Sequence, residues 1–400
     1  MKSLKSMRLH IGIFGRTNVG KSSILNRLTN QEISIVSDVA GTTTDVVEKS
    51  MELLPIGPVT FLDTAGLDDD TELGEKRIEK TMKILNRTHV AIVVCDCNGI
   101  GDYEKELTKK LDELKIPYLV VVNKCDLTEK NNSLNPQNIQ KSSVVYTSAK
   151  TDDRLVFKIK EALIKLLPED FVNSPKIVGD LIPPKSTVIL VIPIDKEAPK
   201  GRIILPQVQT LRDLLDNNCL TYVVKESELK DALANLKTPP ALVVTDSQVF
   251  RQVSEIVSEN IPLTSFSILF ARLKGDLDEF IKGAKAIENL KDGDMVLILE
   301  SCTHHAIEDD IGRVKIPNLL RKKIGKNLVI HNYAGHDFPD LSDYKLVIHC
   351  GACMTNRREV LSRILIANKK NVPITNYGIV ISYCLGILPR ATRIFKDTTV

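Results

Sequence analysis

The sequence is poor in aromatic side chains, and it lacks tryptophan and any long apolar run. Aromatic residues make up 4% of its 400 residues while 43% of the chain is hydrophobic, so the cores must consist mainly of Val, Ile and Leu, as in buried parallel sheets. No stretch approaches the ~18 consecutive apolar residues of a membrane-spanning helix. The first residues also lack the apolar centre of a signal peptide. We therefore expect a cytoplasmic protein with no membrane partner.

An excess of charge of one sign is missing as well. The 54 Lys and Arg residues face 51 Asp and Glu residues, and the net charge of +3 lacks the basic excess of a protein whose main ligand is nucleic acid. The eight cysteines are too few for the length of the chain to suggest a disulfide framework. In a reducing cytoplasm such thiols remain available to metal. The length predicts two or three domains.

A phosphate-binding loop lies near the N-terminus. A predicted strand, Leu9 to Phe14, leads into Gly15-Arg-Thr-Asn-Val-Gly20-Lys21-Ser22, which is a complete G-x-x-x-x-G-K-S motif, and a helix follows to about Leu28. Glycines let backbone N–H groups surround phosphate, Lys21 places a positive charge on the outer phosphates, and the Ser22 hydroxyl binds Mg²⁺. The predicted nucleotide-binding residues here are Gly15, Asn18, Val19, Gly20, Lys21, Ser22 and Ser23.

Two further elements have the spacing of a magnesium-dependent switch. A predicted strand from Val59 ends in Asp63-Thr-Ala-Gly66, where Asp63 would hold Mg²⁺ through water and the Gly66 N–H would sense the γ-phosphate. The polar loop before that strand contains Gly41-Thr-Thr-Thr-Asp45. We expect Thr43, rather than Thr42, to bind Mg²⁺ when the triphosphate is present.

The choice of guanine is predicted by Asn123-Lys124-Cys125-Asp126, which ends the apolar strand beginning at Tyr118. The Asp126 carboxylate can accept hydrogen bonds from N1–H and the 2-amino group of guanine, whereas adenine would present an acceptor to it. A last predicted strand from Val144 leads to Ser148, Ala149 and Lys150 behind the base. With four motifs in order, each at the end of a strand, the region is predicted to be a GTP-binding domain.

These motifs resemble those of the Era and TrmE-like branch of translation-factor GTPases, whose G-T-T-x-D sequence matches Gly41 to Asp45. Leu67 stands where Ras-type enzymes have the glutamine that orients water, so hydrolysis is expected to be slow. Asn18 matches the asparagine that binds K⁺ in potassium-activated members, and the alternative is an asparagine selected for turn geometry. Lys21, Asn18 and Thr43 are the residues expected to act in hydrolysis, with Ser22, Thr43 and Asp63 on Mg²⁺.

The middle of the chain carries no catalytic motif. After the Pro-containing linker around Pro183, apolar strands at 187–192, 222–224 and 241–245 alternate with amphipathic helices, which predicts a small α/β unit of βαβ type.

Two cysteine-containing segments follow in the C-terminal part. Cys302-Thr-His304-His305 comes after a predicted strand at 295–300, and His349-Cys350-Gly-Ala-Cys353 comes after another at 345–349. The carboxyl ends of neighbouring parallel strands meet at one edge, which would bring the three cysteines together. Spacing alone leaves zinc and an iron–sulfur cluster equally open, and the alternative to both is three buried apolar cysteines. A further cysteine, Cys384, is expected in the core of the last helix.

The combination of such a GTPase with C-x-H, about four dozen residues and then H-C-x-x-C resembles the HydF family of FeFe-hydrogenase maturation GTPases. The resemblance implies three α/β domains: a P-loop GTPase domain with a mostly parallel sheet (1–172), a dimerisation domain (173–270) that forms a homodimer, and a cluster-binding domain (271–400). It also implies a 4Fe-4S cluster on Cys302, Cys350 and Cys353. The cargo would be a two-iron precursor bearing CO and cyanide, built with two radical-SAM enzymes and delivered to apo-hydrogenase.

Three thiolates leave one iron of such a cluster without a cysteine, and His304, His349 and Glu308 are the candidate fourth ligands. We expect the GTP state to control partner interaction. The alternative function is a tRNA-modification or ribosome-assembly GTPase with a zinc-stabilised C-terminal domain.

Overall fold

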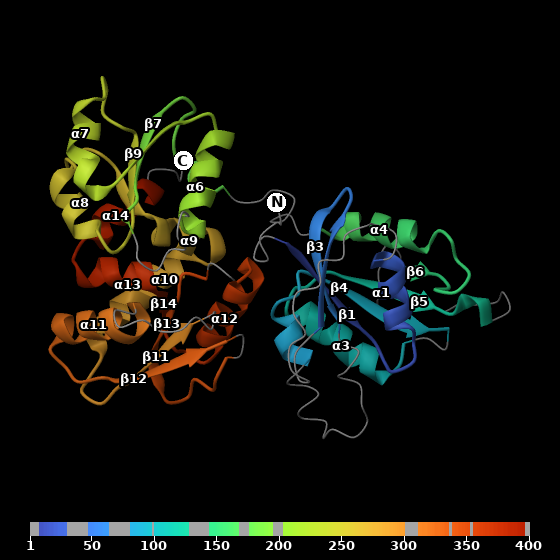
Figure 1. The fold of residues 1–400 in the computed structure, drawn as a ribbon. Coiled ribbons are helices and arrows are strands. Elements are labelled where there is room, and N and C mark those ends of the chain that lie inside the picture. The colour runs from blue at the N-terminus through green and yellow to red at the C-terminus, as the bar shows by residue number, and fades with distance from the viewer. Residues whose placement is uncertain are drawn as a thin grey trace. The chain divides into compact units, whose positions relative to one another are not determined.

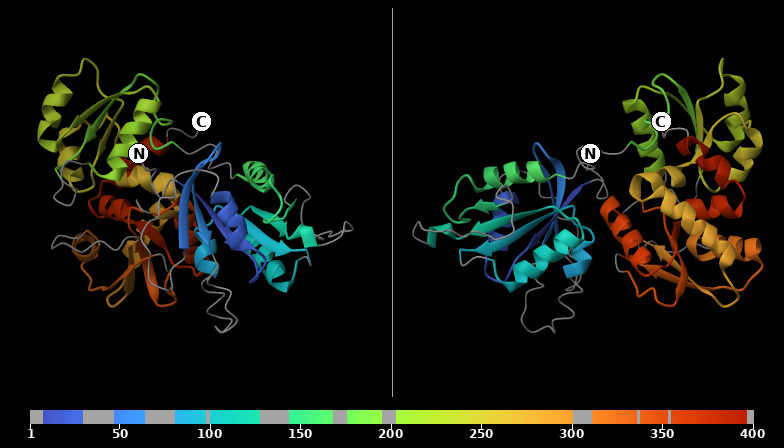
Figure 2. Two further views of the ribbon diagram at one scale, coloured as in Figure 1. Left: turned by 45° about the vertical axis from the view of Figure 1, so that its right-hand side comes forward. Right: turned by 180° about the vertical axis from the view of Figure 1, so that it is seen from behind.

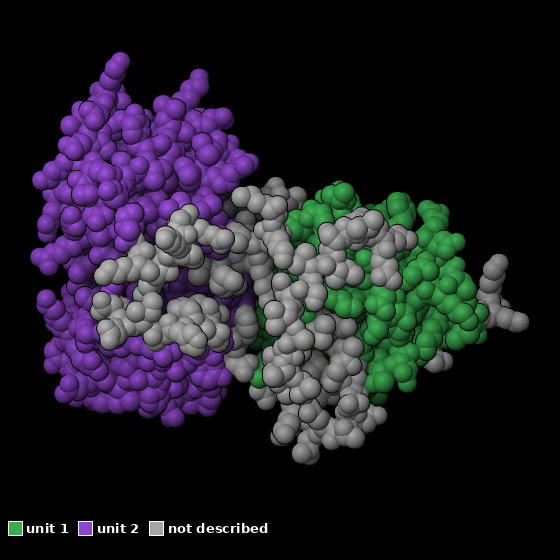
Figure 3. Space-filling model, in the orientation of Figure 1, with its two compact units in different colours: residues 1–174 green, residues 175–400 purple. Residues whose placement is uncertain are grey.

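The computed structural model describes residues 8–29, 47–63, 81–97, 100–127, 144–167, 176–194, 203–300, 311–335, 338–352 and 355–396. The chain divides into two compact units, residues 1–174 and 175–400, which have different colours in Figure 3. Each unit is described by itself. No helix within the described ranges combines the length and the apolar character that crossing a membrane requires.

The first unit contains a six-stranded sheet in the order β2-β3-β1-β4-β5-β6. β2 pairs antiparallel with β3, and every other neighbouring pair is parallel. The fold is therefore the mixed, mostly parallel α/β sheet that the sequence predicts, with the hairpin formed by β2 and β3 as its antiparallel edge. The strands are β1 (Leu9–Phe14), β2 (Val47–Leu53), β3 (Gly57–Asp63), β4 (Val90–Asp96), β5 (Tyr118–Asn123) and β6 (Val144–Tyr146).

Helices cover both faces of this sheet. α1 (Lys21–Thr29) and α4 (Leu155–Leu166) pack on one face and α3 (Asp102–Glu113) on the other (Figure 1 and Figure 2). Because successive side chains of a strand point to opposite faces, a strand buried on both sides needs a continuous apolar run. β4 shows this division: Val90, Ile92 and Val94 belong to the core under α1 and α4, and Ala91, Val93 and Cys95 to the core under α3.

The second unit contains two four-stranded sheets, and all strand pairs in both are parallel. The first has the order β10-β9-β7-β8 and the second the order β12-β11-β13-β14. The strands are β7 (Thr187–Val191), β8 (Leu220–Val224), β9 (Leu242–Thr245), β10 (Leu263–Ser265), β11 (Met295–Glu300), β12 (Val329–Ala334), β13 (Tyr344–His349) and β14 (Ile374–Asn376). The helices are α6 (Leu205–Asp216), α7 (Leu229–Ala234), α8 (Phe250–Ile256), α9 (Phe266–Lys274), α10 (Leu277–Lys285), α11 (Ile316–Ile324), α12 (Arg357–Lys369), α13 (Tyr377–Cys384) and α14 (Leu388–Lys396).

The two sheets of this unit are joined by packing. Ile189 and Val243 of the first sheet lie in the same hydrophobic cluster as Val296 and Val347 of the second. α9 runs through position 270, where the sequence predicts a domain boundary, and α14 returns to pack on β10. The prediction that the last helix holds Cys384 is wrong, because this residue ends α13 and α14 follows. The division of residues 173–400 into two domains therefore stays a proposal.

Within the described residues, each of these sheets has one edge strand covered by a helix and one edge strand with no neighbouring strand, which we call the open edge. α14 packs along β10, and α10 lies so close to β14 that a Cβ on Gly283 would come within 1.9 Å of the Ile374 carbonyl oxygen. β8 and β12 form the opposite edges. Since edge strands present unpaired backbone groups, these two strands are the places where either sheet could add a strand.

Candidate functional site

The phosphate-binding loop lies between β1 and α1 (Figure 1). Its backbone conformation depends on two glycines. Gly15 has a φ of 147° and Gly20 a φ of 98°, which side-chain-bearing residues rarely adopt. A Cβ on Gly15 would lie 2.2 Å from the Val94 carbonyl oxygen, and one on Gly20 would lie 2.2 Å from Nδ2 of Asn123. The loop is therefore packed against the ends of β4 and β5 and tolerates no larger residue at these two positions.

Lys21 folds back over this loop. Its Nζ donates to the carbonyl oxygens of Gly15 at 2.6 Å and Arg16 at 3.1 Å, and its side chain is buried. Ser22 and Ser23 are exposed in the first turn of α1, where backbone N–H groups favour an anion. The Lys21 ammonium therefore rests on the backbone of the loop beside the N-terminus of α1.

Asn123 joins the phosphate loop to the loop after β6. Its Nδ2 donates to the Val19 carbonyl oxygen over 2.9 Å, and its Oδ1 accepts the Ala149 N–H over 2.8 Å. The side chain is 2% exposed, so both bonds are shielded from water. Two predicted motifs, around Val19 and Ala149, are thereby held to the end of β5 although they lie about 130 residues apart in the chain.

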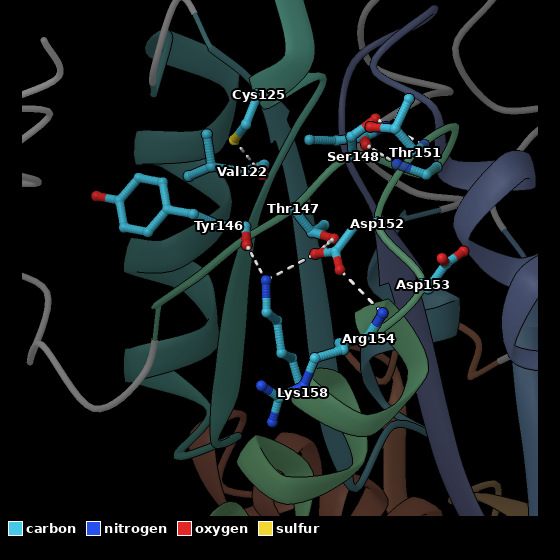
Figure 4. Close-up of polar contacts among 12 residues, drawn as sticks. Val122, Cys125, Tyr146, Thr147, Ser148, Thr151, Asp152, Asp153, Arg154 and Lys158 are labelled. Atoms are coloured by element: carbon cyan, nitrogen blue, oxygen red, sulfur yellow. Dashed lines mark hydrogen bonds and ion pairs between the residues drawn. The ribbon is translucent and has the colours of Figure 1, made fainter. Parts of the chain in front are cut away.

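Asp152 holds the loop after β6 through hydrogen bonds with Thr147, Arg154 and Lys158, as Figure 4 shows. Its Oδ2 accepts hydrogen bonds from Thr147 Oγ1 and Lys158 Nζ, both at 2.7 Å, and its Oδ1 accepts from the Arg154 N–H at 2.9 Å. Burial raises the pKa of this carboxyl, but the hydrogen bonds from Lys158, Thr147 and Arg154 outweigh it and leave the pKa below its usual value. Asp152 was not predicted from the sequence, where its position two residues after Lys150 was the only signal.

The other predicted nucleotide residues are placed only in part. Asp126 is exposed just after β5, Lys124 has a left-handed φ of 62°, and Ser148 Oγ accepts from the Lys150 and Thr151 N–H groups. Asp63 ends β3 and pairs in register with Ile13, which puts its backbone beside the strand that leads into the phosphate loop. Thr42, Thr43 and Gly66 lie outside the described residues.

A second site is indicated where β11 and β13 end. These strands are parallel neighbours in which Leu299 pairs with His349, and the Cys350 N–H donates to the Leu299 carbonyl oxygen over 2.9 Å. Cys350 is half-buried directly after β13. Within the described residues no group of three His, Cys, Asp or Glu side chains could hold a metal ion. The predicted ligands Cys302, His304, Glu308 and Cys353 all lie outside those residues.

His349 is held by hydrogen bonds at both ring nitrogens. Nδ1 lies 2.7 Å from the Cys350 carbonyl oxygen and Nε2 lies 2.6 Å from Nη1 of Arg363. A carbonyl oxygen can only accept and a guanidinium can only donate, so Nδ1 carries the proton and Nε2 accepts. Arg363, which is 2% exposed, also donates to the Gly335 carbonyl oxygen at 2.8 Å and pairs with Glu359 at 3.0 Å. This buried arginine connects α12 with the ends of β12 and β13.

The start of α12 is fixed from two sides. Asn356 caps the helix by accepting the Glu359 N–H over 2.8 Å. Lys274 at the end of α9 donates to the Thr355 carbonyl oxygen over 3.1 Å, and Nη1 of Arg357 donates to three carbonyl oxygens around the end of the same helix. Arg363 and Lys274 were not predicted from the sequence. The signal for Arg363 was a charged residue between apolar side chains of α12, whereas Lys274, the last residue of α9, gave none.

Comparisons with known proteins agree with this layout. The model of the hydrogen maturase F dimerization domain matches residues 177–275, and that of the hydrogen maturase F tetramerization domain matches residues 278–394. Together they match more than half of the chain. The chain belongs to the hydrogen maturase F family. A model described as a 50S ribosome-binding GTPase matches residues 10–124, so a GTPase domain precedes the two family-specific matches along the chain.

Individual relatives resemble only part of the chain. The tRNA modification GTPase MnmE of Prochlorococcus marinus (strain NATL2A) is 39% identical over 160 residues, which are 38% of this chain and 34% of MnmE. GTPase Der of a Nitratiruptor species is 37% identical over 134 residues, 32% of this chain and 29% of Der. The matches thus span about a third of these relatives. Among solved structures, Aquifex aeolicus Era bound to GDP.AlF4- has a TM-score of 0.33 and 21% identity, covering 54% of this chain and 93% of that chain.

Proposed function

We propose that the protein is a cytoplasmic, GTP-hydrolysing scaffold that holds a 4Fe-4S cluster on Cys302, Cys350 and Cys353. Its cargo is a two-iron precursor bearing CO and cyanide, made with two radical-SAM enzymes and delivered to apo FeFe-hydrogenase. The observation that carries the proposal is the parallel pairing of β11 with β13, because the two parts of the cysteine signature follow these strands. Membership of the hydrogen maturase F family supports the same assignment.

The donor set suits iron–sulfur chemistry. Cys302 follows Glu300 by two residues, so covalent geometry keeps their Cα atoms within about 7 Å. Ala352 has a left-handed φ of 55°, which turns the chain between Cys350 and Cys353. Thiolates are the protein ligands that iron–sulfur clusters use. When bound, such a cluster offers one iron without a cysteine, where a replaceable group can bind.

His349 is a poor choice for that replaceable ligand. With Nδ1 protonated and Nε2 accepting from Arg363, its ring has no lone pair left for iron in this arrangement. We therefore favour His304 or Glu308 for the fourth position. His349 instead holds the Cys350 carbonyl, which is the kind of support that metal-binding loops require.

The nucleotide unit is proposed to hydrolyse GTP slowly, with Mg²⁺ on Ser22, Thr43 and Asp63, guanine on Asp126, and K⁺ beside Asn18. GTP hydrolysis is proposed to time the binding and release of partner proteins and to take no part in the iron chemistry. A nucleotide switch changes partner binding only as far as its GTP and GDP states differ in affinity for that partner. The GTP state would accordingly control docking with the radical-SAM enzymes or the hydrogenase.

Homodimerisation is proposed to use the β8 edge of the first sheet in the second unit. Leu220, Tyr222 and Val223 of this strand are 60%, 44% and 48% exposed, and Leu215 of the adjacent α6 is 59% exposed. An open edge with apolar side chains on both faces favours strand addition. A two-fold axis would pair β8 antiparallel with β8 of a second copy and bury these side chains.

Anaerobic purification followed by iron, sulfide and zinc analysis tests the scaffold proposal. Brown protein with about four irons per chain is expected, and Cys350→Ala should lose the iron while GTP hydrolysis continues. Cys384→Ala is the matched control, because this thiol lies in the same unit outside the signature sequence and burial raises its pKa to about 11. Colourless protein with one zinc per chain would refute the scaffold proposal. That result would favour a tRNA-modification or ribosome-assembly GTPase with a zinc-stabilised domain.

A further inference from the structure

Arg16, the second residue of the phosphate-binding motif, is held by a buried carboxylate on α3. Its Nε donates to Oε1 of Glu104 over 2.9 Å, and Nη2 lies 3.9 Å from Oδ1 of Asp96. The Glu104 side chain is 0% exposed, and its Oε2 accepts the Gly101 N–H over 2.9 Å. Both oxygens of this carboxylate therefore have donors, one of them charged.

The ion pair between Arg16 and Glu104 is not well explained by a contribution to folding stability alone. Removing a carboxylate from water carries a large desolvation penalty, and an apolar side chain of similar size often packs at lower cost. Glu104 also serves as the residue that caps the first turn of α3 through Gly101, but this needs only one of its two oxygens. The oxygen bound to Arg16 points to a role in the phosphate loop.

The backbone of Arg16 leads to the lysine of the motif. Lys21 Nζ rests on the carbonyl oxygens of Gly15 and Arg16, at 2.6 Å and 3.1 Å. Arg16 is thus fixed at its guanidinium by α3 and touches the Lys21 ammonium through its own carbonyl. A shift of the Arg16 peptide would move the surface that supports Lys21.

We propose that Glu104, acting through Arg16, is a positioning residue for nucleotide phosphates: it holds the loop backbone in the shape that receives them. This inference rests on the proposed GTPase function. The loop contacts a phosphate that GDP and GTP share, so loss of the pair weakens the binding of both nucleotides. Because Lys21 is also expected to act in hydrolysis, a displaced loop should raise KM and lower kcat as well.

The test compares two carboxylates on α3. In Glu104→Gln, one amide oxygen has to replace two carboxylate oxygens and the charge is lost. Glu106→Gln is the matched control, because Glu106 forms an exposed pair with Lys110 at 2.7 Å on the same helix. We expect the dissociation constant of fluorescent GDP, measured on the full chain, to rise about tenfold in Glu104→Gln and to stay within about twofold in Glu106→Gln.

A double-mutant cycle separates positioning from simple loss of structure. If Glu104 acts through Arg16, then Arg16→Ala with Glu104→Gln should bind GDP no worse than Arg16→Ala alone, and Arg16→Lys should recover part of the affinity. Additive losses, or a lower melting temperature with unchanged GDP affinity, would overturn the inference. A wild-type protein that binds no guanine nucleotide would refute the GTPase proposal itself.

Gly101→Ala provides a second route if Glu104→Gln does not fold. A Cβ at this position would lie 3.1 Å from Oε2 of Glu104 and 3.3 Å from Cζ of Arg16, while the backbone there suits alanine. The substitution crowds the pair and removes no charge. Weaker GDP binding supports the inference, and wild-type affinity contradicts it.

Discussion

Arg363 donates a hydrogen bond to Nε2 of His349 over 2.6 Å, and neither side chain is more than 2% exposed. Nδ1 is then left to donate to the Cys350 carbonyl oxygen, so His349 adopts a single tautomer and links α12 to the residue that follows β13. Because Glu359 and the Gly335 carbonyl oxygen hold the same guanidinium, contacts within the protein fix the orientation of His349.

The first prediction concerns this histidine in apo-protein. His349→Gln should lower the free energy of unfolding by about 1–3 kcal/mol, because it disturbs the acceptor of a buried guanidinium. Urea unfolding of metal-free protein measures the effect. His331→Gln is the control, since His331 is exposed and shares a hydrogen bond with the Tyr344 hydroxyl at 2.9 Å, and it should cost less than about 1 kcal/mol. An equal effect of both changes would show that His349 is not an anchor.

The second prediction separates two reasons for an asparagine at position 18. Asn18 has a φ of 65°, a left-handed conformation that asparagine tolerates, so turn geometry alone could account for it. Asn18→Gly keeps that backbone conformation and removes the side-chain oxygen. If Asn18 binds K⁺, wild type should hydrolyse GTP several times faster in KCl than in NaCl, and the glycine variant should lose the difference. Stimulation that survives in Asn18→Gly would leave Asn18 with a conformational role only.

The sequence predicts those parts of both sites that depend on local patterns. The strand before Gly15 and the strands before Cys350 and Asn123 are apolar runs that end in polar motifs, and each forms as predicted. Arg363 and α14 could not be predicted in this way. Their partners lie far away in the chain, at Gly335 and in β10, and local periodicity contains no information about such contacts.

The third prediction follows from the pKa of Asp152, which its hydrogen bonds hold below the usual value despite burial. A group with a lower pKa in the folded state stabilises the protein above its unfolded-state pKa of about 3.9 and loses this effect as pH falls through the folded value. Asp152→Asn should therefore cost about 1–3 kcal/mol at pH 7. The gap to wild type should narrow as pH falls below about 4.

Thermal or urea unfolding at several pH values measures this gap. Asp153→Asn is the neighbouring control, because the Asp153 side chain is fully exposed and only approaches Arg27 at 4.0 Å. It should have little effect at any pH. A gap for Asp152→Asn that is independent of pH would mean that the charge of Asp152 does not stabilise the loop after β6.

The last prediction concerns the open edge at β8. Tyr222→Lys places a charge in the middle of a strand whose apolar side chains are exposed in the isolated chain. A two-fold interface would bring two such lysines together without partners, and edge lysines are a known means of preventing strand pairing. The family models include one dimerization and one tetramerization domain, so the variant should retain the second contact. We therefore expect the mass of its largest assembly to be half that of wild type.

Sedimentation measures the mass of the assembly. Leu365→Lys, on the exposed side of α12, is the matched control and should leave the assembly intact, since Leu365 is similarly exposed at 41% but lies on no sheet edge. GTP hydrolysis should continue in both variants, and an unchanged mass for Tyr222→Lys would place the dimer interface elsewhere.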